Sequence, residues 1–123
     1  MRNVILDTSF ILTAIKYKID FLDGIKFLGL TPIIPKQVIN ELEKIKESKK
    51  KGKFKEHAEI ALKIFEKKKI KKIDIKHDYV DKGILNYAKK DKGVIIATMD
   101  KELKNKLPNR KLIIRAMKRL ELA

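Results

Sequence analysis

The sequence predicts an α/β fold in which helices cover both faces of a mainly parallel sheet of about five strands. Two observations lead to this prediction. Short apolar runs such as Val4–Leu6 and Val94–Thr98 are typical of strands that are buried on both faces. Helical patterns separate these runs, and strands that alternate with helices are joined by right-handed crossovers in a parallel sheet. The length of 123 residues suits a single domain over residues 1–123.

The elements are predicted in chain order from apolar spacing and from residues that begin or end helices. Pro35 suits the first turn of a helix because its missing N–H costs nothing there, and Gly93 and Pro108 each end a helix. The predicted order is a strand over 4–6, helices over 8–16 and 19–28, a strand over 31–35, helices over 35–47 and 54–68, a strand over 70–75, a helix over 79–91, a strand over 94–98, a helix over 101–107, a strand over 111–115, and a short edge strand or frayed tail over 119–122.

The charge of the chain indicates a polyanionic partner. Lys and Arg number 31 against 16 Asp and Glu, which leaves a net charge of +15. A Lys-rich, ion-paired surface of a thermophilic protein is the alternative, but ion-pair networks need both signs in similar numbers. Nucleic acid is therefore favoured. A basic loop contains the residues most suited to phosphate contacts, which are Lys49, Lys50, Lys51 and Lys53.

The apolar runs and the absence of cysteine limit the other classes. No run approaches the roughly 18 residues of a membrane span, and no signal-peptide pattern is present, so we expect a cytoplasmic protein without membrane contact. Zero cysteines exclude disulfides and thiolate zinc sites. His57 and His77 have no partner at metal-ligand spacing, and we expect neither to be catalytic.

Asp7 lies at the position where the first strand ends and the first helix begins. Ligands of open α/β sheets bind outside the carboxyl ends of the strands, so this carboxylate lies where such folds carry their sites. Asp, Thr and Ser are also good helix caps, and Asp7 alone is equally well explained as a cap. Other carboxylates at the same edge would decide between these readings.

Three further carboxylates are candidates for that edge. Asp100 follows the apolar strand over 94–98 and repeats the arrangement of Asp7, although it could also cap the next helix. On helical wheels, Glu41 borders the apolar stripe of its helix and Asp81 falls inside the apolar arc of another. The alternative for Asp81 is a favourable interaction with the helix dipole from the first turn.

Clustered carboxylates repel one another unless divalent cations lie among them. Hard oxygen ligands without cysteine select Mg²⁺ or Mn²⁺. Such ions activate water and neutralise charge at a phosphodiester. An acidic centre within a basic surface therefore favours a metal-dependent nuclease.

The chain resembles the PIN-domain ribonuclease family. Four segments carry the resemblance over essentially the whole chain: Val4–Ile11, Ile33–Leu42, Tyr79–Ala88 and Val94–Leu103. The resemblance implies a three-layer α/β/α sandwich and Mg²⁺- or Mn²⁺-dependent endonucleolytic cleavage of single-stranded RNA. It assigns metal binding and catalysis to Asp7, Glu41, Asp81 and Asp100, and orientation of acids or water to Ser9 and Thr98. Many members have consecutive acids where this chain has Val80 and Asp81, so a fifth ligand is missing unless Glu102 replaces it.

Two branches of the family are compatible with the sequence. VapC-type toxins have a similar length and pair with an antitoxin protein, whereas another branch processes precursor ribosomal RNA; the lysine-dense surface favours the second slightly. Outside catalysis, the chain could be a catalytically silent RNA-binding or assembly module. A phosphotransfer or dehalogenase-like domain would need a second acid at position 9, which is Ser.

A homodimer or larger assembly is expected from the second predicted helix. Apolar side chains crowd most of its circumference, namely Phe21, Leu22, Ile25, Phe27 and Leu28. Such a helix must be buried on more than one side. The segment over 54–68 could instead cover it within one chain. The family resemblance also implies pairing, with a shared basic groove for single-stranded RNA.

Overall fold

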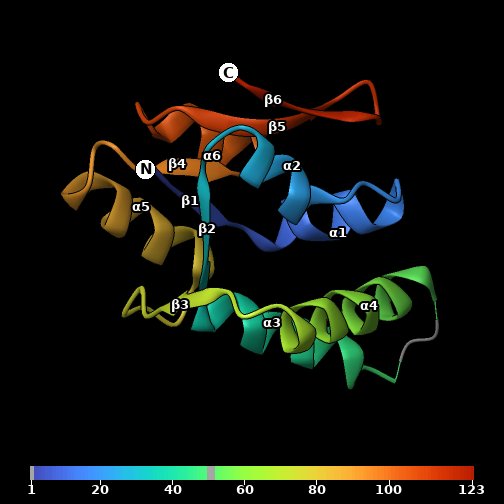
Figure 1. The fold of residues 1–123 in the computed structure, drawn as a ribbon. Helices are drawn as coiled ribbons and strands as arrows, with labels where there is room; N and C mark the ends of the chain where they lie inside the picture. Colours follow the sequence, from blue (N-terminus) through green and yellow to red (C-terminus); the bar gives the residue numbers. More distant parts are fainter. Residues whose placement is uncertain (1, 50–51) are drawn as a thin grey trace.

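The computed structural model of the chain describes residues 2–49 and 52–123. Strands and helices alternate through these residues, as the sequence predicts (Figure 1). The strands are β1 (Asn3–Leu6), β2 (Thr31–Pro35), β3 (Lys71–Ile73), β4 (Ile95–Ala97), β5 (Lys111–Arg115) and β6 (Arg119–Leu122). The helices are α1 (Thr8–Lys16), α2 (Phe21–Phe27), α3 (Lys36–Lys46), α4 (Lys53–Lys67), α5 (Val80–Lys90) and α6 (Lys101–Lys106).

The strands form one six-stranded sheet in the order β3-β2-β1-β4-β5-β6. The first five strands of that order are parallel, and β6 runs antiparallel to β5. The predicted sheet of about five strands is confirmed, with β6 as the additional strand. Residues 119–122 are an edge strand and not a frayed tail, because the tight turn at Ala116 and Met117, both at positive φ, returns the chain alongside β5.

Helices cover both faces of this sheet, which confirms the predicted three-layer α/β fold. The chain moves outward from β1 to β2 and β3, and then returns across the sheet to β4 and β5. Right-handed crossovers consequently place α1 to α4 on one face and α5 and α6 on the other. In Figure 1, α1, α3 and α4 lie to the right of the β1–β2 pair, and α5 lies to the left.

The second helix is covered largely by its own chain. Phe21 packs edge-on against Phe10 of α1 and Phe65 of α4, with ring centroids 6.2 and 6.1 Å away. α2 continues through Gly24, and Leu120 of β6 approaches this glycine so closely that a Cβ there would lie 2.7 Å from the Leu120 Cδ1 atom. Phe27 remains 92% exposed. The sequence left open whether a second subunit or residues 54–68 cover this helix. The contact of Phe65 with Phe21 shows that α4 covers part of it.

Within the described residues, no helix combines the length and hydrophobicity that crossing a membrane requires.

Candidate active site

The register of the two central strands brings two polar residues together at one edge. Leu6 of β1 pairs with Ala97 of β4, so the residues that follow them, Asp7 and Thr98, leave the sheet side by side. The Asp7 N–H donates to the Ala97 carbonyl at 3.0 Å. The connections from β1 and β4 lead to opposite faces of the sheet. This makes their carboxyl ends the topological switch point, where open α/β sheets bind ligands.

Asp7 is buried and accepts three hydrogen bonds. One carboxylate oxygen, Oδ1, accepts from the Thr8 N–H at 2.8 Å and so caps α1. The other, Oδ2, accepts from the Ser9 hydroxyl at 2.9 Å and from the Thr98 hydroxyl at 2.7 Å. Asp7 therefore caps the helix with one oxygen and joins the polar residues of the sheet edge with the other, so the two roles that the sequence allowed do not exclude each other.

The hydroxyls of Ser9 and Thr98 are held in place from the other side. Ser9 Oγ accepts from the Met99 N–H, and Thr98 Oγ1 accepts from the Asp100 N–H, both at 3.1 Å. Each hydroxyl has one hydrogen, and both hydrogens are directed at Asp7. Their mutual 3.3 Å approach is therefore a contact without a donor. The backbone N–H groups fix the two hydroxyls, and the hydroxyls in turn hold the Asp7 carboxylate in one orientation.

Asp100 also caps a helix. Its Oδ1 accepts from the Glu102 N–H at 2.9 Å and from the Leu103 N–H at 3.4 Å at the start of α6. For Oδ2, no hydrogen-bond donor is found within residues 2–49 and 52–123. Asp100 thus resembles Asp7 in using one oxygen to cap a helix, but among the described residues its second oxygen lacks the hydroxyl donors that hold Asp7 Oδ2.

Electrostatic coupling links these carboxylates to α5. Burial raises the pKa of Asp7 above its ordinary value, the bonds from Thr98, Ser9 and Thr8 counteract this, and the charge of Asp81 raises it again. Partial burial likewise raises the pKa of Asp81, the charges of Asp100 and Glu102 add to that increase, and the charge of Lys106 counteracts part of it. The edge therefore concentrates negative charge that a cation would relieve.

Two details of the acidic group differ from the sequence expectations. Asp81 lies on the side of α5 that carries Ile84 and Ala88, but at the first turn of the helix it is exposed and not buried. Glu102, weighed above only as a replacement ligand, is among the charges that act on Asp81. Its position two residues after Asp100, in the first turn of a short helix, was the available signal.

Glu41 lies half-buried in α3, and its charge is not among those that act on the pKa of Asp7 or of Asp81. Nor do three or more acidic or histidine side chains of these residues stand close enough together to form a ready-made metal cluster. The donor chemistry nevertheless suits a hard cation, since the edge offers carboxylate and hydroxyl oxygens.

The predicted basic loop is described only in part. Lys49 is exposed before the gap, and Lys53 is the exposed first residue of α4. Lys50 and Lys51 lie outside the described residues.

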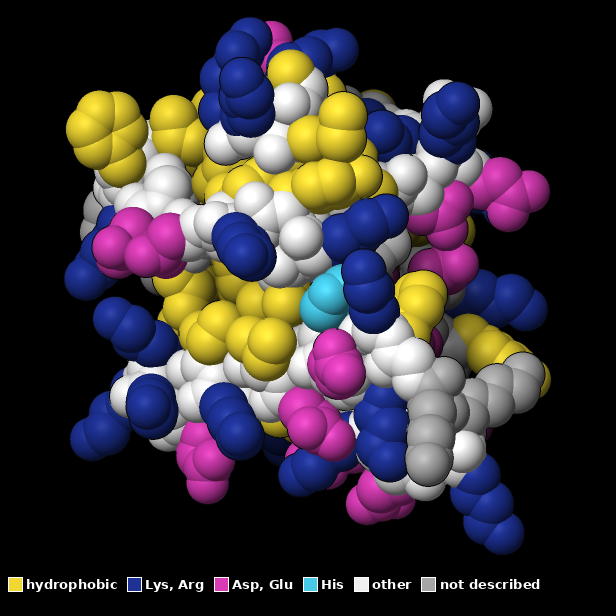
Figure 2. Space-filling view, turned by 90° about the vertical axis from the view of Figure 1, so that its right-hand side faces the viewer, with side chains coloured by type: hydrophobic (Ala, Val, Ile, Leu, Met, Phe, Trp, Pro, Cys, Tyr) yellow, Lys and Arg dark blue, Asp and Glu magenta, His cyan; other side chains and the backbone are white. Residues whose placement is uncertain are grey.

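A hollow of about 320 Å³ adjoins the carboxylate edge between α1 and α4. It is lined by Ser9, Leu12, Thr13, Lys16, Lys53, Phe54 and His57. A second hollow of about 500 Å³ shares Lys16 and His57 with it and continues between α4 and the α1–α2 segment over Ile15, Ile19, Ile60 and Ile64. Figure 2 shows this face of the molecule, where hydrophobic side chains gather in a depression bordered by charged side chains of both signs. Sequence reasoning missed this groove, because its two walls are far apart in the chain.

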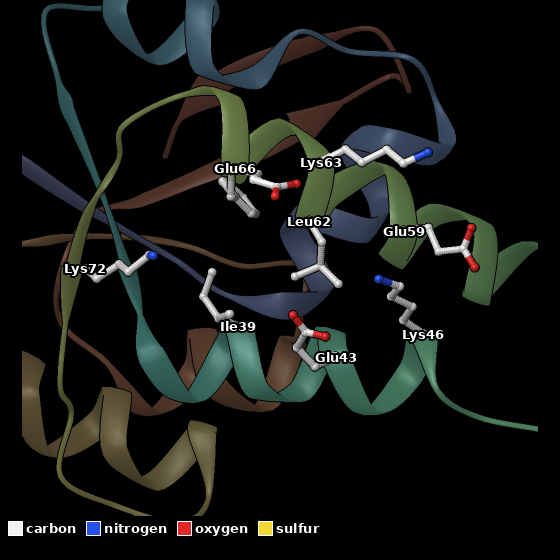
Figure 3. A pocket seen from close by; sticks show the side chains of 9 residues that line it. Ile39, Glu43, Lys46, Glu59, Leu62, Lys63, Glu66 and Lys72 are labelled. Carbon is white, nitrogen blue, oxygen red and sulfur yellow. The ribbon is translucent and has the colours of Figure 1, made fainter.

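Another hollow, of about 390 Å³, lies between α3 and α4. Its rim carries Lys46, Lys63 and Lys72 alongside Glu43, Glu59 and Glu66 (Figure 3). Because these charges balance and none of the residues at the carboxylate edge lines it, this hollow favours no charged ligand.

Comparisons with known proteins agree with this fold. A family model described as a PIN-like domain matches residues 4–119. The chain is 39% identical over 111 residues to ribonuclease VapC4 of Methanocaldococcus jannaschii, covering 87% of this chain and 83% of that protein. The solved PIN domain endonuclease Utp24 superposes with a TM-score of 0.79 at 26% identity, covering 98% of this chain and 90% of that one. VapBC2 from Rickettsia felis, solved with a promoter DNA fragment, shares the fold with a TM-score of 0.53 at 20% identity, covering 89% and 98%.

Proposed function

The chain belongs to the PIN domain family, and on that premise we propose that it is an endoribonuclease that hydrolyses single-stranded RNA with Mg²⁺ or Mn²⁺. A ribonuclease and a PIN endonuclease among the proteins that it resembles support nuclease activity. The single observation that carries the proposal is the fixed Asp7 carboxylate at the switch point, coupled to Asp81 and through it to Asp100.

The residues that would hold a divalent cation are Asp7, Asp81 and Asp100, with Glu41 brought in by a rotation of its side chain on α3. When bound, the cation would neutralise phosphate charge and activate the attacking water. Ser9 and Thr98 position Asp7 by donating to Oδ2, so that the carboxylate needs no reordering when substrate arrives. Glu102 adds negative charge beside Asp81 and thereby favours cation binding.

The basic surface would supply substrate affinity. The net charge of +15 attracts the RNA backbone over long range, and exposed lysines such as Lys49 and Lys53 contact phosphates without reading sequence. Repulsion between the acidic edge and the phosphates keeps the strand out of the site unless a cation is bound. The protein would act in the cytoplasm.

Two cellular roles are compatible with the family. The 39% identity to a protein named ribonuclease VapC4 favours a toxin that an antitoxin protein restrains, whereas the lysine-dense surface favours processing of precursor ribosomal RNA. If expression of the protein arrests growth, and the product of the adjacent gene relieves that arrest, the toxin role is assigned. Accumulation of unprocessed ribosomal RNA on depletion assigns the other.

The proposal is tested with purified protein and a labelled single-stranded RNA. Cleavage should require Mg²⁺ or Mn²⁺ and stop with chelator. Asp7→Asn should lower the rate by more than about 100-fold, since losing even an outer-shell partner of a metal costs 10- to 100-fold. Asp23→Asn, a matched change at an exposed acid in the first turn of α2, should cleave normally.

Undiminished cleavage by Asp7→Asn would refute the assignment. Absence of cleavage by the unchanged protein, together with retained RNA binding, would instead identify the catalytically silent RNA-binding module.

A further inference from the structure

The hollow between α1 and α4 begins at the carboxylate edge itself. Ser9 lines this hollow and donates to Asp7 Oδ2 at 2.9 Å. A ligand that fills the hollow would therefore contact the residue that positions Asp7. Its volume of about 320 Å³ is at the lower end of the range of ligand pockets.

The walls of this hollow combine one flat apolar face with positive charge. Phe54 is 64% exposed, although burial of a Phe side chain is favourable. Lys16 and Lys53 are exposed on either side, and half-buried His57 lies one turn beyond Phe54 on α4. Leu12 supplies the apolar floor.

Charge distinguishes this hollow from its neighbours. Every charged or titratable side chain that lines it is a base. The hollow between α3 and α4 has three Glu beside its three Lys, and the one that continues toward α2 contains Asp20 and Glu56. A ligand with anionic groups and flat rings fits the first hollow best, and this is the chemistry of single-stranded nucleic acid.

We infer that the α1–α4 hollow binds the nucleotide of the RNA strand next to the scissile phosphate, with its base stacked on Phe54 and its flanking phosphates on Lys16 and Lys53. The inference rests on the proposed function, because it assigns the path by which the same substrate reaches Asp7. Stacking tolerates any base, so the hollow sets affinity and strand position but not sequence.

Binding is measured in the Asp7→Asn background, which prevents cleavage during the assay, by fluorescence anisotropy of a labelled oligouridylate of about eight nucleotides. Phe54→Ala should weaken binding by about 5- to 150-fold, the range reported for loss of one base stack. Phe54→Leu, which keeps apolar area without a flat ring, should behave like Phe54→Ala, and Phe54→Trp should restore binding. Ile60→Ala, at a 45% exposed apolar residue of the same helix outside this hollow, should bind normally.

The lysines are tested by salt dependence. The double variant Lys16→Gln/Lys53→Gln should reduce the slope of log K against log salt by about 1.4, or 0.7 for each phosphate contact. The control pair Lys63→Gln/Lys72→Gln, with the same loss of charge at the α3–α4 hollow, should change it less. Circular dichroism should give the same melting temperature for all variants, since these side chains are exposed.

Equal affinity of Phe54→Ala and Phe54→Trp, or an equal loss in Ile60→Ala, would overturn the inference and leave the hollow to a protein partner. Failure of the two proposals can be told apart. Normal RNA cleavage with no effect at Phe54 removes only this inference, and Phe54-dependent binding without cleavage by the unchanged protein removes only the nuclease.

Discussion

At the scale of single residues, Asp7 is both a structural cap and the centre of the candidate site. Its burial and its proximity to Asp81 raise its pKa, so the ionised carboxylate is less favourable in the folded chain than in the unfolded one. The hydroxyls of Ser9 and Thr98 can reverse to accept from an amide, which lets Asn occupy the same place. Without a cation, the ionised Asp7 therefore lowers the stability of the folded chain, and a bound cation would relieve this effect.

This imbalance predicts that Asp7→Asn raises the melting temperature of the metal-free protein at pH 7. Because the folded-state pKa is raised, protonation stabilises the folded chain. The advantage of the variant is therefore full at neutral pH, shrinks as pH falls through the raised pKa, and is constant below the unfolded value of about 4. Thermal melts in chelator across this window measure the difference. A variant less stable than the unchanged protein at pH 7 would show that the carboxylate is not repelled.

At the scale of elements, Gly83 sets how closely α5 approaches the segment that precedes it. A Cβ at Gly83 would lie 2.5 Å from Cδ1 and 2.8 Å from Cγ1 of Ile75, and 3.1 Å from the His77 Cβ. Ile75 is buried and cannot move freely. The glycine consequently determines the position of Asp81, which lies in the same first turns of α5.

We expect Gly83→Ala to lower the free energy of unfolding by about 1 to 3 kcal/mol through overpacking and to lower the cleavage rate as well. Gly24→Ala is the matched control. There the added Cβ meets only the end of the half-buried Leu120 side chain, and the gain in helix propensity of about 0.5 to 1 kcal/mol offsets the contact. Denaturant titrations and cleavage assays of both variants test this, and equal effects of the two substitutions would contradict it.

The basic loop makes a second prediction at this scale. Replacing Lys49, Lys50, Lys51 and Lys53 with Gln should weaken RNA binding uniformly across sequences, because lysines contact phosphates and not base edges. The salt slope should fall by up to about 2.8 if all four contact phosphates. Binding titrations with several unrelated single-stranded RNAs measure both quantities. A loop that serves only solubility would leave the slope unchanged.

At the scale of the whole molecule, exposed apolar surface remains between the end of α2 and the β5–β6 hairpin. Phe27, Leu28 and Met117 are 92%, 39% and 61% exposed and line a hollow of about 600 Å³. Their side chains lie on segments far apart in the sequence, and together they form a patch of the kind that marks protein contacts. The side of α2 that faces the core, by contrast, is already covered by Phe10 and Phe65.

We therefore expect a homodimer that covers this patch. Light scattering at micromolar concentration in about 0.3 M salt, where long-range electrostatic attraction is screened, should give twice the 14.3 kDa of one chain. Phe27→Lys should return the mass to that of one chain. A monomeric mass for the unchanged protein would remove the dimer and any RNA groove shared between subunits.

The sequence alone determined the fold class and most of the element positions. Buried strands such as β1 and β4 must be continuous apolar runs, and helices must repeat their apolar residues, so both leave local patterns. The same reasoning placed Asp7 and Asp100 at strand ends, where a parallel sheet gathers polar residues at one edge. The outermost strand β6 was left open, because edge strands are short and half-exposed and their pattern is weak.

Tertiary structure decided what depends on the packing of separate segments. The register of Leu6 against Ala97 brings Thr98 to Asp7, and no local pattern contains that register. The exposure of Asp81 depends on how α5 packs against the sheet, which a helical wheel cannot give. The α1–α4 hollow exists only because Ser9 and Phe54, 45 positions apart in the chain, meet across two helices whose apolar faces pack together.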